Sequence, residues 1–365
     1  MISYSRQTIN PADIKMVSAV LKSDWLTTGP WVAKFERAVA TYIGAKYAVA
    51  VANGTAALHV ACLAAEVGNN DEVIMPTYSF VASANCVLYC GGKPVLVDID
   101  EQTLCIDINQ IEQKINRHTR AIIGVDFGGR AANWRRLRQL AKKYKLTLID
   151  DAAHSFGSEY RGKKIGTQVD ISCFSFHPVK TITTGEGGMV VTNNKQLYQR
   201  AMVLRTHGIT KLPQPQPWYY EMRQLGYNYR LTDLQSALGL AQLKRANKFL
   251  AKRKKLAWRY NHKLNSLANL ILPEWSETPA WHLYPLRINF KALKKTRVEL
   301  FALMQRHGIS LQVHYIPIHL QPYYQRNLNY RQGDFPMAEK VYDQEVSLPL
   351  YPTLTYKQQD QVIEL

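Results

Sequence analysis

The sequence has few acidic residues, few cysteines and no long apolar run, and each shortage argues against a class of protein. It contains 28 aspartate and glutamate residues against 46 lysine and arginine residues. Its five cysteines are odd in number and lack paired short spacings, which argues against a disulfide framework and a structural zinc site. No apolar run reaches membrane-spanning length. The first fifteen residues lack the apolar stretch of a signal peptide, so the sequence predicts a cytoplasmic protein without a membrane partner.

The excess of basic residues gives a formal net charge of +18, and much of it comes from residues 135–145 and 244–255. Nucleic-acid binding is one interpretation of these runs. Both runs have a helical pattern, however, and no nucleic-acid motif accompanies them. Solvated helix faces are therefore the favoured interpretation. The positive field would also attract an anionic substrate such as a sugar nucleotide.

Apolar segments alternate with segments of helical period along the first half of the chain. The 365 residues are 46% hydrophobic, which is enough for one large domain or for a large and a small one. Several apolar segments are continuous, as is typical of strands buried on both faces. This repetition predicts an α/β fold with a largely parallel sheet. The expected strands are 48–52, 72–76, 94–98, 121–127, 146–150, 171–176 and 189–192.

Helix-capping signals place the main helices. Asn10 and Pro11 begin the first, whose apolar face is expected to contain Ile14, Val17, Val20 and Leu21. The segment 232–235 is a capping box that opens a long helix running to about Lys255. This helix is expected to connect a large domain, 1–245, to a small domain, 246–365. A further helix is expected at 296–307, and the proline-rich segment 213–218 is expected to form an exposed loop.

Lys180 is the most informative residue for function. It lies between an apolar run, 169–176, and a glycine turn, 185–188. Most lysines are surface residues, but this context indicates a buried amine, which can act as nucleophile and proton carrier. Such an amine can form a Schiff base with an aldehyde cofactor.

Asp151 ends the apolar run 146–150, where open α/β sheets bind their ligands. An aspartate at this place can hold a cofactor's ring nitrogen protonated, although a single such residue can also be a helix cap. His154 could contact a bound ring or be a structural histidine. Asp150 should point away from Asp151 because side chains alternate along a strand. Lys180 and Asp151 together predict a pyridoxal-phosphate (PLP) enzyme.

The segment 53–57 follows a strand and opens a helix. Free backbone N–H groups at such a start bind phosphate well, and Gly54 and Thr55 would suit that role. A plain helix cap is the alternative interpretation of this segment.

Seven blocks of sequence carry a resemblance to a known family. They are NGTAAL, PTYSFVASAN, DDAAHSFGSEY, SFHPVKTITTGEGGMVVTN, RTHGI, YNYRLTDLQSALGLAQL and LQVHYIPIH. In this order they resemble the sugar-nucleotide aminotransferases of the DegT/DnrJ/EryC1/StrS family, in fold-type I of PLP enzymes. The blocks VDFGGRAANW and QVHYIPIHLQPYY look most like the branch that aminates C4 of a UDP-linked 4-keto-6-deoxy-acetamido sugar in pseudaminic-acid synthesis.

The resemblance implies a role for each matching residue. Lys180 would be the Schiff-base residue, Asp151 would pair with the pyridine nitrogen, and His154 would lie near the phenolic oxygen of the cofactor. Phe80 would stack on the ring. The cofactor phosphate would be held by Thr55, Ala56 and Ser175, with Asn228 reaching it from a second subunit, so a homodimer is expected. Candidates for the sugar-nucleotide pocket are Tyr4, Thr28, Arg230, His314 and Tyr315.

The resemblance implies transfer of an amino group, with glutamate as the expected donor. One alternative is a relative that aminates C3 or acts on another nucleotide sugar. A second is a PLP-type dehydratase, but in the dehydratases of this family a histidine replaces the lysine that is Lys180 here. A third is a non-catalytic sensor or scaffold with the same fold, which the presence of both Asp151 and Lys180 argues against.

Overall fold

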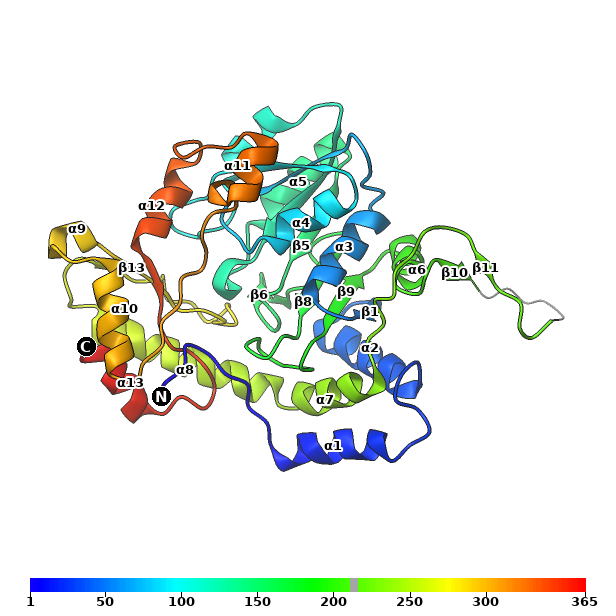
Figure 1. The fold of residues 1–365 in the computed structure, drawn as a ribbon, viewed down its shortest axis with the longest axis horizontal. Coiled ribbons are helices and arrows are strands. Elements are labelled where there is room, and N and C mark those ends of the chain that lie inside the picture. The colour runs from blue at the N-terminus through cyan, green and yellow to red at the C-terminus, as the bar shows by residue number, and fades with distance from the viewer. Residues whose placement is uncertain (211–215) are drawn as a thin grey trace.

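A seven-stranded sheet forms the centre of the computed structural model, which describes residues 1–210 and 216–365 (Figure 1). The strand order is β1-β9-β8-β5-β4-β2-β3. Strands β3, β2, β4, β5 and β8 run parallel, whereas β9 is antiparallel to both β8 and β1. The strands of this sheet are β1 Tyr47–Val51, β2 Glu72–Pro76, β3 Lys93–Val97, β4 Thr119–Val125, β5 Thr147–Asp151, β8 Ile171–Ser175 and β9 Gly188–Thr192.

The predicted α/β class and the largely parallel sheet are confirmed. Every expected strand is present, and most ends lie within one residue of the prediction. The largest shift is in β4, which ends at Val125 although the apolar run continues to Phe127. The chain turns there because Asp126 folds back to accept hydrogen bonds from the Ala132 backbone and the Trp134 indole.

Helices cover the sheet and connect its strands. Helix α3 packs on β8 and β9, α5 packs on β5, and α1 and α2 pack on α7. Four helices, α1, α7, α10 and α13, begin with capping boxes, among them the two predicted at Asn10 and Thr232. The helices are α1 Pro11–Leu21, α2 Pro30–Ile43, α3 Gly54–Ala64, α4 Ala82–Tyr89, α5 Trp134–Tyr144, α6 Lys195–Leu204, α7 Asp233–Leu243, α8 Ala246–Leu264, α9 Phe290–Leu293, α10 Arg297–Arg306, α11 Pro322–Leu328, α12 Pro336–Gln344 and α13 Tyr356–Ile363.

Two helix predictions were wrong in detail. The single long helix expected from Thr232 is broken between α7 and α8, because Arg245 leaves helical geometry and pairs with the buried carboxylate of Asp13. The first helix does not bury the whole expected face. Val20 is buried, but Ile14 and Leu21 are exposed, because α1 contacts α7 over only part of its surface.

A second hydrophobic cluster lies away from the large sheet. It contains residues of α8 and α10 and of the small sheet formed by β12 Leu270–Ile271, β13 Pro285–Ile288 and β14 Glu345–Ser347. Segments of α11 and α12 instead join the first cluster, through Tyr324 and Val341. The division into domains 1–245 and 246–365 stays a prediction.

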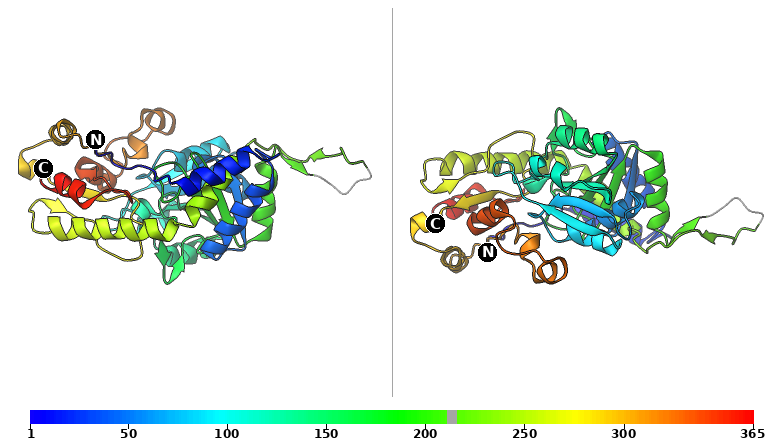
Figure 2. Two further views of the ribbon diagram at one scale, coloured as in Figure 1. Left: turned by 90° about the horizontal axis from the view of Figure 1, so that it is seen from below. Right: turned by 90° about the horizontal axis from the view of Figure 1, so that it is seen from above.

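The hairpin of β10 Ile209–Thr210 and β11 Glu221–Met222 projects from the rest of the molecule (Figure 2). On it, Trp218 is 76% exposed, and Leu225, three residues after β11, is 70% exposed. The proline-rich segment 213–218 lies partly outside the described residues. The remaining short strands are β6 Glu159–Tyr160 and β7 Lys163–Lys164.

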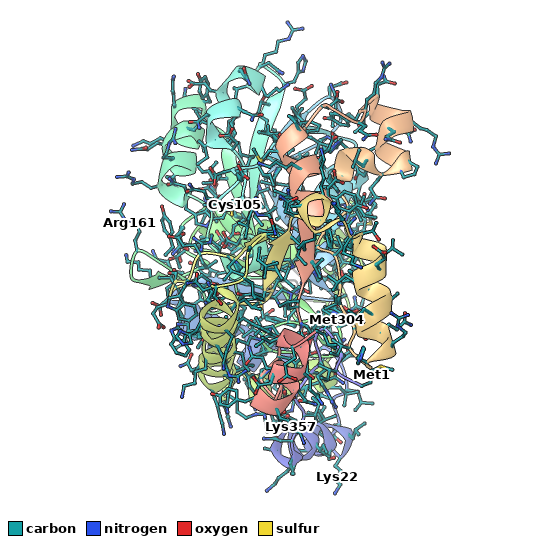
Figure 3. All side chains as sticks on the ribbon, turned by 90° about the vertical axis from the view of Figure 1, so that its left-hand side faces the viewer. Met1, Lys22, Cys105, Arg161, Met304 and Lys357 are labelled. Atoms are coloured by element: carbon teal, nitrogen blue, oxygen red, sulfur yellow. The ribbon has the colours of Figure 1, made fainter. Side chains whose placement is uncertain are left out.

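Charged side chains such as Lys22 and Arg161 extend outward from the surface (Figure 3). Both basic runs lie on helices, namely α5 and the region of α7 and α8. Among the described residues, none of the helices has the length and apolarity needed to cross a membrane.

Candidate active site

A cavity of about 580 Å³ lies at the carboxyl ends of β5 and β8. Asp151 is the last residue of β5 and Ser175 is the last residue of β8. The N-terminus of α3, the loop after β8 and the segment 312–315 complete the walls. Of the predicted site residues, the lining includes Tyr4, Thr55, Phe80, Asp151, His154, Ser175, Lys180, His314 and Tyr315.

Lys180 and Asp151 form the charged centre of this cavity. Burial lowers the pKa of Lys180 to about 8, while the nearby charge of Asp151 acts in the opposite direction. The neutral, nucleophilic amine is therefore far more populated near neutral pH than in an exposed lysine. Burial raises the pKa of Asp151, and hydrogen bonds from Ser83 and Ala153 oppose that effect.

Ser83 holds the Asp151 carboxyl in place. Its hydroxyl donates to Oδ2 of Asp151 at 2.6 Å, and the backbone N–H of Ala153 donates to Oδ1 at 3.3 Å. Ser83 is in turn 2.8 Å from the hydroxyl of Ser79. Sequence reasoning missed Ser83, which lies in the first turn of α4, whereas Ser79 lies in the loop before that helix.

Asp150 points to the other side of the strand, as alternation predicts. It is fully buried and accepts a hydrogen bond from the hydroxyl of Ser172 at 3.1 Å. Burial raises the pKa of its carboxyl well above the ordinary value. Asp150 is thus part of the sheet interior and does not line the cavity.

His154 has a defined tautomer. The backbone N–H of Gly128 donates to its Nδ1 at 3.3 Å, so in the neutral imidazole Nε2 carries the proton. Nε2 lies 3.0 Å from the hydroxyl oxygen of Tyr315 and donates to it. Burial, followed by the positive charge of Lys180, lowers the pKa of His154 well below its ordinary value and keeps the ring neutral.

The start of α3 lies against the end of β8. A Cβ atom added to Gly54 would lie 2.8 Å from Cβ of Ser175, so only glycine permits this approach. The side chain of Asn53 caps the helix by accepting from the N–H of Ala56 at 2.8 Å. Ala56 is therefore behind the lining, whereas Gly54, Thr55 and Ser175 face the cavity.

Three predicted residues lie elsewhere in the single chain. Thr28 and Arg230 line a separate cavity of about 520 Å³, together with Glu36 and Arg205. Asn228 is exposed and forms an isolated bridge with Thr206. The fold of one chain therefore does not bring these three residues to Lys180.

His282 lines the cavity and was not found from the sequence. Its ring centroid is 4.5 Å from that of His154, and its buried Nδ1 has no hydrogen-bond partner among the described residues. It follows β8 by more than a hundred residues, and no local signal connects it with Lys180.

Residues 7–365 match the model of the DegT/DnrJ/EryC1/StrS aminotransferase family. The chain belongs to this family. It is an aminotransferase, and the predicted resemblance and fold are confirmed. An uncharacterized protein of Methanocaldococcus jannaschii is 41% identical over 99% of this chain and 94% of its own length. UDP-4-amino-4,6-dideoxy-N-acetyl-beta-L-altrosamine transaminase of Campylobacter jejuni is 38% identical over 98% of this chain and 94% of its own.

Solved structures agree with this assignment. Helicobacter pylori PseC, an aminotransferase of pseudaminic-acid biosynthesis, superimposes with a TM-score of 0.94 at 33% identity and covers 100% of this chain and 97% of its own. The sugar aminotransferase Spr1654 of Streptococcus pneumoniae has been solved in a pyridoxamine-phosphate (PMP) form and a PLP form. These superimpose with TM-scores of 0.93 and 0.92 at 31% identity, and each covers 99% of this chain and 96% of its own. PLP, the cofactor predicted from the sequence, is thus confirmed as a cofactor of this family.

Proposed function

We propose that this aminotransferase uses PLP to transfer the amino group of glutamate to C4 of a UDP-linked 4-keto-6-deoxy-acetamido sugar. The observation that carries the proposal is the meeting of Lys180 and Asp151 in one cavity at the carboxyl ends of β5 and β8. The sugar is proposed from the relatives in Campylobacter jejuni and Helicobacter pylori, whose names specify such a reaction or pathway.

The side chains that line the cavity can bind each part of PLP. Asp151 supplies a carboxylate that a protonated ring nitrogen would neutralise, and Lys180 supplies the amine that attaches to the aldehyde. Thr55 and Ser175 offer hydroxyls, beside the N-terminus of α3, for the phosphate. His154 and Phe80 border the remaining space, with Phe80 as the ring-stacking candidate and Ala56 as the less direct phosphate contact.

When bound, PLP withdraws electrons from the carbon that loses its proton. Asp151 would hold the pyridine nitrogen protonated and so maintain this withdrawal. The Nζ of Lys180 would accept the proton of the donor carbon and return it. With its pKa lowered to about 8, its amine can both accept and return that proton near neutral pH.

The nucleotide end of the substrate is expected to meet positive charge and aromatic rings. Tyr4, His314 and Tyr315 face the cavity and are proposed to contact the sugar. We further propose a cytoplasmic homodimer in which Asn228 of one chain reaches the cofactor phosphate of the other. The exposed position of Asn228, which bridges to Thr206 just before β10, supports this arrangement. Thr28 and Arg230, which face a separate cavity in one chain, are proposed to complete the pocket in the dimer.

The assay that tests this function uses purified holoenzyme, glutamate and a panel of UDP- and dTDP-linked keto sugars. Amination of the UDP-linked 4-keto-6-deoxy-acetamido sugar, with 2-oxoglutarate formed in equal amount, is the expected result. If only a C3-keto sugar or a dTDP-linked sugar is aminated, the proposed substrate is wrong, but the proposed reaction, transfer of an amino group, is retained. Absence of a visible absorption band after incubation with PLP would instead favour the non-catalytic alternative.

A further inference from the structure

Three buried side chains connect the active-site cavity with the small sheet. Glu345 and Ser347 are two residues apart on β14, so their side chains lie on one face of the strand. The Ser347 hydroxyl is 2.5 Å from Oε1 of Glu345, and its oxygen is 2.8 Å from Nδ1 of His314. The backbone N–H of His314 donates to Oε2 of Glu345 at 2.8 Å. The exposed fractions are 0% for Glu345, 1% for Ser347 and 6% for His314, so water does not replace these bonds.

His314 is the end of this chain of hydrogen bonds that faces the cavity. It lines the same cavity as Lys180, and its ring centroid is 5.6 Å from that of Tyr4. Since Nδ1 is hydrogen-bonded to Ser347, Nε2 is the ring nitrogen that can bind a ligand in the cavity. Burial, followed by the positive charge of Lys180, lowers the pKa of His314 to about 3, so the ring is neutral. A neutral imidazole has one N–H donor and one acceptor, which makes the polarity of Nε2 the opposite of that of Nδ1.

The direction of the hydrogen bonds depends on the protonation of Glu345. When Glu345 is protonated, it donates to Ser347, Ser347 donates to Nδ1 of His314, and Nε2 carries the proton. When Glu345 is ionised, it can only accept, so Ser347 donates to it and accepts from Nδ1–H. Nε2 then presents a lone pair. Passing from the first state to the second moves each proton one bond along the chain and releases one proton at Nε2.

We propose that Glu345, Ser347 and His314 form a proton relay in which the ionisation of Glu345 decides whether Nε2 of His314 presents a donor or an acceptor to the cavity. His314 contacts the substrate, and Glu345 and Ser347 are its positioning residues. The consequence for the substrate rests on the proposed function. A keto oxygen can only accept a hydrogen bond, whereas a hydroxyl or amine can also donate, so the two states favour different groups on the sugar ring.

Burial and the neighbouring groups set the pKa of Glu345 at a pH that can be reached in solution experiments. Burial raises the pKa of Glu345 to about 8, against hydrogen bonds from Ser347 and the His314 backbone. The charged or titratable groups that face Glu345 are Arg297 of α10, Arg287 of β13, Tyr78 and Tyr315. Those that face His314 are Lys180, His154, His282 and Tyr4.

The relay is tested by nitrogen NMR of the PLP-loaded protein labelled with ¹⁵N-histidine. The His314 signals are assigned by their loss in His314→Gln. As the pH is raised through about 8, Nε2 of His314 should change from the shift of a protonated nitrogen to that of an unprotonated one, and Nδ1 should do the reverse. In Glu345→Gln, which cannot ionise, this exchange should be absent. In Ser347→Ala it should also be absent, because the connection is cut.

Glu277→Gln is the matched control, because the side chain of Glu277 is 78% exposed and outside the cavity. It should retain the wild-type exchange. Unchanged His314 shifts in the wild type across this pH range would overturn the relay, and so would wild-type exchange in Glu345→Gln.

Kinetics give a second, separate readout. In Glu345→Gln the pH dependence of the KM for the keto sugar near 8 should become weaker, because only Lys180 still titrates there, while the rate of the glutamate half-reaction stays within about twofold of the wild type. Equal losses in both half-reactions would contradict a role toward the sugar. If the protein aminates no nucleotide sugar but the NMR exchange is present, the proposed function fails and the relay stands. If the protein is active and the shifts are constant, the relay alone fails.

Discussion

At the scale of the residue, a single amine decides whether the protein can work. Lys180→Ala should lose turnover by at least about 10³-fold, because both the attachment of the cofactor and the proton transfer depend on Nζ. Lys180→Arg should behave in the same way, since a guanidinium stays protonated. Formation of 2-oxoglutarate in a single-turnover assay measures the effect.

The control is Lys163→Ala, an exposed lysine of β7 whose loss should leave the rate unchanged. Turnover near the wild-type value in Lys180→Ala would contradict the role of the residue.

Substitutions of Asp151 and Ser83 should lower the rate of proton transfer by different amounts. Asp151→Asn removes the negative charge that keeps the ring nitrogen protonated, and a fall of about 10²–10⁴-fold in kcat is expected. Ser83→Ala removes only the 2.6 Å hydrogen bond to Oδ2 and should cost much less. Half-reaction rates by stopped-flow absorbance measure both, with exposed Asp24→Asn as the control. A larger loss in Ser83→Ala than in Asp151→Asn would contradict this order.

The raised pKa of Glu345 predicts how the free energy of unfolding depends on pH. Its folded pKa of about 8 lies above the ordinary value of about 4.3 for glutamate, so the folded state binds the proton more tightly than the unfolded state. Its contribution to the free energy of unfolding therefore falls as the pH rises through this window. Urea unfolding of the wild type and Glu345→Gln should show the wild type losing stability relative to the variant between pH 5 and pH 8. A constant difference would show that Glu345 does not titrate there.

At the scale of the element, helix caps set local stability. In α10 the side chain of Thr296 accepts from the N–H of Glu299 at 3.2 Å, and Glu299 accepts from the N–H of Thr296 at 2.7 Å. Thr296→Ala should lower the free energy of unfolding by about 1 kcal/mol. Chemical denaturation measures the change, with exposed Ser266→Ala as the control. Equal stability of the two variants would mean that the cap contributes nothing.

Element prediction from the sequence succeeded where the signal was local. Continuous apolar runs gave the strands of the large sheet, and the caps at Asn10 and Thr232 gave the correct helix starts. The break between α7 and α8 was not predictable from period or propensity. It depends on the ion pair of Arg245 with Asp13, a residue more than two hundred positions away.

At the scale of the whole molecule, the central question is whether two chains share each active site. Lys180→Ala and Asn228→Ala, each inactive or impaired as a homodimer, should complement one another when mixed and allowed to exchange subunits. One site of each mixed dimer would then have both native residues, so random exchange should restore about a quarter of wild-type activity. Activity is measured before and after exchange.

Two mixtures control for this result: each variant exchanged with itself. The absence of any gain on mixing the two variants, in subunits shown to exchange, would place Lys180 and Asn228 in the same chain's site or in no shared site.

The sequence by itself determined the α/β class, the strand positions and the residues at strand ends, because apolar period, caps and glycine turns act over a few residues. It also predicted Lys180 and Asp151 as partners, because a buried amine and a carboxylate supply the two contacts that a PLP enzyme needs. Only the tertiary structure decided which distant groups complete the site. His282 reaches the cavity, and Ser83, Glu345 and Ser347 reach the residues that line it, through packing of elements that lie far apart in the chain. Burial in that packing lowers the pKa of His282 and raises that of Glu345.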